Sequence, residues 1–129
     1  MENLTSGQAA DIANCLRELN GSIEEFRFEP KNQLTDTQKK TLDDLMEQVS
    51  DAAQQILAES TTLVMEDVNT SLTTIKKITE QIKKTITSVA DVQKVIVITA
   101  SVLTLGTSIL SKDPQSIGNA IGGLVNAKI

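Results

Sequence analysis

The chain has 129 residues, of which 40% are hydrophobic and 22% charged, and its net charge is −5. Phe26 and Phe28 are its only aromatic residues, so a core must be built from Ile, Leu, Val, Ala and Met, which suits packed helices. Two prolines, six glycines and a lack of hairpin signals argue against a β-rich fold. The sequence therefore predicts a single all-α domain over residues 1–129.

Side chains that usually carry catalysis or bind metals are scarce. The chain has no histidine, which removes the commonest general base and metal ligand, and Cys15 is its only cysteine. Its carboxylates occur in polar helical stretches, where a solvated surface is the simpler explanation. We expect no enzyme activity, no catalytic or metal-binding residue, no cofactor and no small-molecule substrate.

The start of the chain and its single cysteine bear on location. Residues 1–4 contain neither a basic nor an apolar stretch, so we expect no cleaved signal peptide. One cysteine cannot form an intramolecular disulfide, which favours a reducing compartment. The expectation is a cytoplasmic protein, or one exported without a cleaved signal peptide, with membrane association left open.

Two amphipathic patterns predict the first two helices. Apolar residues from Ile12 to Phe26 recur at spacings of three and four, which indicates a helix over 8–28 with Thr5 or Ser6 as its N-cap. Thr35 and Gln38 have the spacing of a capping box, which predicts that a second, acidic helix begins there and extends to about residue 65. Its apolar residues at a spacing of seven are Leu42, Val49, Ile56 and Leu63.

A second apolar series recurs every seven residues through the rest of the chain. It comprises Val68, Ile75, Ile82, Val89, Ile96, Leu103 and Leu110. A repeat of this length is typical of a long helix with one seam against a partner, so we expect a helix over 70–111 with a coiled-coil-like interface. The first oligomeric state to expect is a dimer. The five-residue step from Leu63 to Val68 predicts a turn near residues 66–71. The alternative is one helix from 36 to 111.

Residues 95–111 form an uncharged run between Lys94 and Lys112. As a helix, this run spans roughly 25 Å against roughly 30 Å for the hydrocarbon core of a bilayer, so it either lies buried among helices or enters a membrane. Six of its residues are Ser or Thr, and five of these fall within an arc of about 120°. The residues that would face lipid or a lumen are Val95, Ile98, Ser101, Val102, Thr104, Leu105, Ser108 and Ile109.

Charge is distributed unevenly along the chain. Residues 1–68 hold 14 Asp or Glu against 5 Lys or Arg, whereas residues 69–129 hold 3 against 7. Four lysines, Lys76, Lys77, Lys83 and Lys84, lie on the helix face opposite the nearby isoleucines. We expect them to pair with the acidic second helix or to contact an anionic lipid surface. Nucleic-acid binding is not expected, because no arginine or aromatic residue accompanies them.

The end of the chain predicts a short helix over 114–126. Asp113 and Pro114 have the order of an N-cap followed by a proline at the first helical position. Gly118 and Gly122 weaken this helix, although their spacing also matches that of close helix contacts in membranes. We interpret this segment as a short helix that needs packing to be held.

Together these elements predict an extended helical bundle or a long helical hairpin. A third helix longer than the second would leave its apolar end overhanging, with much of residues 95–110 exposed in a monomer. Two functions follow from that overhang. The first is a non-catalytic helical interaction or assembly module, whose partner is another protein or a second copy of the chain. The alternative is a membrane-active protein, such as a pore-forming or toxin-type component, that inserts residues 95–111.

Overall fold

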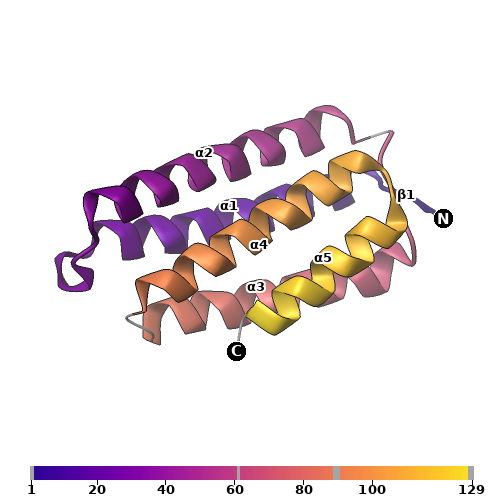
Figure 1. Cartoon of the computed structure of the whole chain (residues 1–129). Helices are drawn as coiled ribbons and strands as arrows, with labels where there is room; N and C mark the ends of the chain where they lie inside the picture. Colours follow the sequence, from indigo (N-terminus) through magenta and orange to yellow (C-terminus); the bar gives the residue numbers. More distant parts are fainter. Residues whose placement is uncertain (1, 61, 89–90, 128–129) are drawn as a thin grey trace.

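The computed structural model describes residues 2–60, 62–88 and 91–127. These residues are almost entirely helical (Figure 1), which confirms the expected all-α class. In chain order, the described elements are β1 (Glu2–Asn3), α1 (Ser6–Phe28), the 3-10 helix η1 (Pro30–Asn32), α2 (Asp36–Ala58), β2 (Val64–Met65), α3 (Val68–Ser88), α4 (Val92–Ser111) and α5 (Pro114–Ala127).

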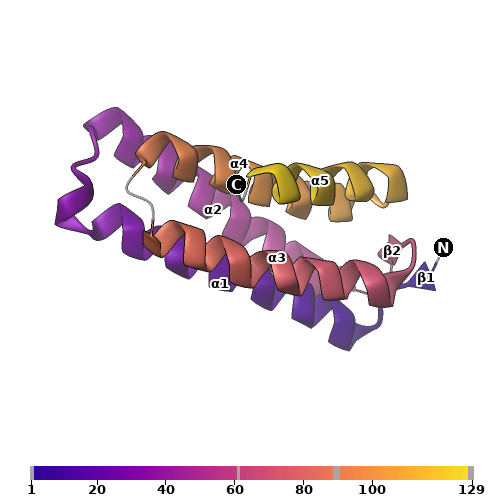
Figure 2. The same cartoon turned by 90° about the horizontal axis from the view of Figure 1, so that it is seen from below.

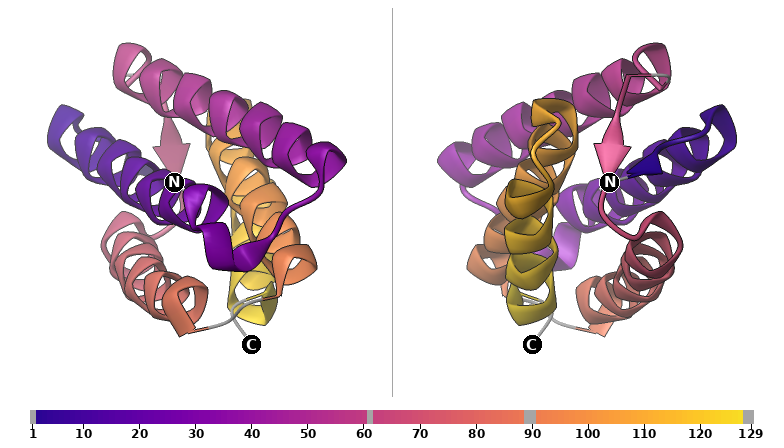
Figure 3. Two further views of the ribbon diagram at one scale, coloured as in Figure 1. Left: turned by 90° about the vertical axis from the view of Figure 1, so that its left-hand side faces the viewer. Right: turned by 90° about the vertical axis from the view of Figure 1, so that its right-hand side faces the viewer.

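The helices pack around a common apolar core. End-on views show α1 between α2 and α3, and α4 between α2 and α5 (Figure 3). Every α-helix contributes buried residues to this core; examples with at most 2% exposure are Leu16, Ile56, Ile82, Leu105 and Leu124. The chain therefore buries apolar residues from its whole length in one core.

Two short strands tie the start of the chain to the connection between α2 and α3. They pair antiparallel, with Glu2 opposite Met65 and Asn3 opposite Val64, and lie together near the N-terminus (Figure 2). The amide of Leu4 also donates to the carbonyl of Leu63 at 2.9 Å. This pairing fixes the point at which the chain turns from α2 into α3.

The capping residues predicted for α1, α2 and α5 are confirmed. Thr5 caps α1 and Thr35 caps α2, and in both the hydroxyl accepts from the amide of a glutamine three residues later at 3.1 Å. The side chain of Gln8 or Gln38 accepts in return from the threonine amide at 2.9 Å. At α5, the carboxylate of Asp113 accepts from the amide of Gln115 at 3.1 Å, and Pro114 is the first helical residue.

The second helix is shorter than predicted. It ends at Ala58 rather than near residue 65, and the chain passes through β2 before α3 begins at Val68. Asp67 has a positive φ of 46°, and its carboxylate accepts from the amide of Thr70 at 3.4 Å. The turn predicted near residues 66–71 is therefore present, and one continuous helix from 36 to 111 is wrong.

The single helix expected over 70–111 is also wrong, because the structure divides it in two. Helix α3 ends at Ser88, and α4 begins at Val92 behind its N-cap Asp91, whose carboxylate accepts from the amides of Gln93 and Lys94. This break lets α4 run back along α2 instead of overhanging (Figure 1). Val89, one of the predicted seam residues, lies outside the described residues.

A bidentate ion pair links α1 to α2. Nε of Arg27 donates to Oδ1 of Asp43 and Nη2 donates to Oδ2, both at 3.0 Å. Because the guanidinium hydrogen bonds favour the charged carboxylate, the pKa of Asp43 lies below its ordinary value of 3.8. This pair thus makes stability dependent on pH.

Replacing Asp43 with Asn is expected to lower stability slightly at neutral pH and not at all in strong acid. A depressed folded-state pKa gives stabilisation that is fully present above the ordinary value of 3.8 and is lost as the pH falls through the lower folded value. Urea unfolding of the wild type and Asp43→Asn at a series of pH values should give curves that converge in acid. An equal separation at every pH would contradict this effect.

Candidate functional site

Helix α4 contains most of the residues that the sequence marks as functional. One side of this helix is buried in the hydrophobic core. Of the predicted membrane or lumen residues, Val95, Ile98, Val102, Leu105 and Ile109 are at most 1% exposed. The expectation that this stretch is exposed in a monomer is therefore wrong. The reason is the break before Val92, which places α4 between α2 and α5.

Helices α4 and α2 approach each other closely at Gly106. A Cβ atom at this position would lie 3.1 Å from Cβ of Ala52 and 3.5 Å from Cδ1 of Leu16. Only a glycine therefore lets these helices pack at this distance without adjustment. This contact fixes α4 against α2 near the middle of the core.

A second row of apolar side chains on α4 lies at the edge of the core. We call Val92, Ile96, Leu103 and Leu110 the α4 flank; on a helical projection they fall within an arc of about 40°. All four are packed against the core but only partly buried. Val97, which lies about 100° further around the helix than Ile96, is 48% exposed and adds a separate apolar side chain to this surface. An apolar strip thus remains partly open to solvent after the chain has folded.

The predicted heptad seam divides between these two environments. On α3, its members Val68, Ile75 and Ile82 are at most 2% exposed and belong to the core of the same chain. On α4, its members Ile96, Leu103 and Leu110 belong to the half-buried α4 flank. Among the seam members that the structure describes, therefore, only those on α4 have surface left to offer a partner.

The hydroxyl-bearing side of α4 borders a groove shared with α5. The groove has a volume of about 320 Å³. Helix α4 provides Ser101, Thr104 and Ser108, three of the residues expected to face a lumen, and α5 adds residues that the sequence argument did not select. These are Ser116, Asn119, Ala120 and Gly123. These residues recur at spacings of three and four, which places them on one side of α5. That pattern in the sequence could have identified them.

Helix α4 is also the one described helix whose length and composition would let it cross a membrane. Of the residues in that apolar window, 39% are buried inside the chain. Because core helices of soluble proteins can pass the same test, the finding supports membrane association only weakly.

The four lysines of α3 do not act as one group. Lys76 lies 3.3 Å from Asp11, and Lys83 lies 3.9 Å from Glu18, so both pair with α1 rather than with the acidic α2 as expected. Lys77 and Lys84 are exposed and have no ion pair within 4.0 Å among the described residues. Any contact with an anionic surface would thus begin at Lys77 and Lys84.

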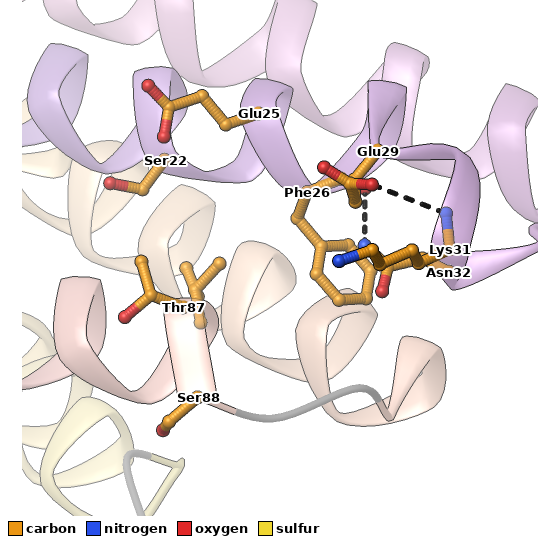
Figure 4. Close-up of a pocket in the computed structure, with 9 residues that line it drawn as sticks. Ser22, Glu25, Phe26, Glu29, Lys31, Asn32, Thr87 and Ser88 are labelled. Atoms are coloured by element: carbon orange, nitrogen blue, oxygen red, sulfur yellow. Dashed lines mark hydrogen bonds between the residues drawn. The ribbon is translucent and has the colours of Figure 1, made fainter.

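A hollow of about 410 Å³ lies where the end of α1 meets the end of α3 (Figure 4). Its polar groups largely close the turn into η1: Nδ2 of Asn32 donates to the carbonyl of Phe26 at 2.8 Å, and the amide of Lys31 donates to Glu29 at 3.4 Å. The described residues contain no group of three His, Cys, Asp or Glu side chains that could hold a metal ion. We therefore place the candidate site on α4 and α5.

We compared the chain with models of protein families, with curated proteins and with solved structures. None of the three comparisons gives a match. Its function is therefore inferred from its own residues.

Proposed function

We propose that this chain is a non-catalytic helical interaction and assembly module that acts through helix packing and self-association. The α4 flank carries the proposal. Its apolar side chains, three of them at a spacing of seven, stay partly open although the core is already complete. A partner helix that covers such a row gains apolar burial, at roughly 25 cal/mol per Å².

The partner we propose is a second copy of the chain. Two copies of the α4 flank related by a two-fold axis would present the same row of Ile96, Leu103 and Leu110 to each other. The α3 members of the heptad series are not needed, since they are buried in each chain. This interface would be a short coiled-coil-like contact rather than a seam along a long helix.

Leu103→Gln is expected to weaken self-association while the chain stays folded. Glutamine is a good helix former, and Leu103 is only partly buried, so the main loss is apolar surface at the contact. Light scattering over a concentration series should show the wild type gaining mass and the variant remaining a monomer. Thr104→Gln, at an exposed position one residue away, is the control and should associate like the wild type. Equal masses for wild type and Leu103→Gln would count against the α4 flank.

A second candidate function is supported by the composition of α4 and α5. From residue 95 to residue 127, the charged residues are Lys112 and Asp113, which occupy the turn between these helices. Together with the membrane-compatible length of α4, this favours a membrane-active protein that stores an apolar hairpin against α1, α2 and α3 and later inserts it. Leakage of a dye from vesicles is the direct test, and Leu103→Lys should abolish it.

If the chain binds anionic vesicles, the location of the lysines predicts which of them matter. Lys77→Ala with Lys84→Ala should weaken binding, because these ammonium groups are exposed and close to a surface each contributes about 1 kcal/mol. Lys76→Ala with Lys83→Ala changes the net charge equally but removes lysines that already pair with α1, so its effect should be smaller. Co-sedimentation with vesicles of phosphatidylcholine and phosphatidylglycerol measures both. Equal losses would contradict a specific role for the exposed pair.

A further inference from the structure

The hairpin of α4 and α5 has two sides of opposite character. Toward the core, Ile98, Leu105 and Ile109 of α4 and Ile117 and Leu124 of α5 are at most 2% exposed. Toward solvent, the two helices share the groove described above, where four hydroxyls and one amide lie beside Ala120 and Gly123. The polar side is thus a continuous feature of both helices and carries no charge.

Three of the four hydroxyl groups on this polar side, those of Ser101, Thr104 and Ser116, already have acceptors within the hairpin. Ser101 and Thr104 each donate to a backbone carbonyl four residues earlier at 3.0 Å, and Ser116 donates to Asp113 at 2.9 Å. An unpaired donor is costly in hydrocarbon, where no water can accept from it. These groups would therefore bring few unsatisfied donors into a bilayer, while their oxygens stay open to water in the groove.

The length of α4 also fits a bilayer. Lys94 and Lys112 stand 18 positions apart in the sequence. At about 1.5 Å per residue this is roughly 27 Å, close to the roughly 30 Å hydrocarbon core. Helix α5, with 14 residues, is shorter and covers roughly two thirds of that depth. Lys94 and Lys112 would thus lie near the two membrane surfaces, with no charged residue of α4 between them.

We infer that α4 and α5 enter the bilayer together and that their shared polar groove lines a water-filled lumen. This inference rests on the membrane-active function proposed above, and it adds α5 to the lining. On leaving α1, α2 and α3, the apolar side of the hairpin faces lipid. Several copies then place Ser108 of α4 and Asn119 of α5 around one lumen.

Cysteine accessibility in open channels tests this arrangement. Cys15, the only cysteine, is buried and is first replaced by alanine. Into this parent we introduce Ser108→Cys, Asn119→Cys or, as control, Thr107→Cys, an exposed hydroxyl that does not line the groove. Each protein is added to planar bilayers of phosphatidylcholine and phosphatidylglycerol, and a cationic, membrane-impermeant methanethiosulfonate follows. Circular dichroism of each protein in solution verifies that it is folded.

The expected result is a stepwise loss of conductance for Ser108→Cys and for Asn119→Cys, with none for Thr107→Cys or the parent. Channels in which Ser108→Cys responds and Asn119→Cys does not would overturn the role of α5 and leave the membrane function intact. Channels in which neither responds would overturn the groove as the lumen lining. Absence of channels from the wild type in every lipid mixture would overturn the membrane function and this inference with it.

Discussion

Replacing Ile82 with Asp is expected to unfold the chain. Ile82 is 0% exposed and lies in the core that α3 shares with the other helices. Burying an unpaired carboxylate costs several kcal/mol, and loss of the isoleucine side chain adds about 2–5 kcal/mol. Because a domain of this size has a total stability of about 5–15 kcal/mol, the sum is comparable to the whole. Thermal unfolding followed by circular dichroism should show no cooperative transition.

Lys83→Ala is the matched control on the same helix. Lys83 is adjacent in sequence, partly exposed, and pairs with Glu18 at 3.9 Å and Glu80 at 3.6 Å. Exposed pairs of this kind contribute about 0–1 kcal/mol, so this variant should unfold cooperatively close to the wild-type temperature. Similar melting curves for Ile82→Asp and Lys83→Ala would mean that the face of α3 assigned to the core is incorrect.

Replacing Gly106 with Val is expected to destabilise the chain by about 1–3 kcal/mol through overpacking. Even the Cβ of an added side chain would lie 3.1 Å from Cβ of Ala52, and the two further methyl groups of valine need space that α2 and Leu16 already occupy. The better helix propensity of valine returns only a few tenths of a kcal/mol. Helices α2 and α4 would have to move apart along their contact.

Gly122→Val is the control for this prediction, since it makes the same chemical change in α5. A Cβ at Gly122 meets nothing within 4 Å, so only the gain in helix propensity remains and stability should stay equal or rise slightly. Urea unfolding of both variants gives the comparison. Equal destabilisation at the two sites would show that the α2–α4 contact at Gly106 is not as close as described.

Local signals in the sequence correctly predicted the capping residues of α2 and α5. The capping box of Thr35 and Gln38 requires only neighbouring residues, and so does the order of Asp113 and Pro114, so both could be read without tertiary information. The predicted start of α1 was two residues late. It was placed from the apolar pattern, which begins several residues after the N-cap Thr5. Helices with such local signals can be recognised without knowing which other helices they pack against.

Apolar spacing was less reliable at helix ends. Leu63 continues the heptad of the second helix and is fully buried, yet it follows the end of α2 and hydrogen-bonds through its carbonyl to Leu4. The second series likewise runs across the break between α3 and α4. An apolar side chain can be buried in the core whether it lies in a helix or in a connecting segment. A regular apolar spacing can therefore continue past the end of a helix.

In the candidate site, too, features within one helix could be predicted from the sequence, whereas contacts between helices could not. The helical projection placed the four lysines on one face, but it could not show that α1 would come close enough for Asp11 and Glu18 to pair with two of them. Similarly, the hydroxyls of α4 were recognised from their arc, whereas the contribution of Ser116 and Asn119 depends on α5 folding back along α4. Contacts between helices distant in sequence decide which of the marked residues stay available.

Amide hydrogen exchange at low and high protein concentration tests the proposed use of the α4 flank most directly. If two copies associate through Ile96, Leu103 and Leu110, peptides from α4 should become more protected as the concentration rises, while peptides from α3 change little because its seam residues are already buried. Exchange in α4 that is independent of concentration, in a sample whose mass stays that of one chain, would contradict self-association through this helix.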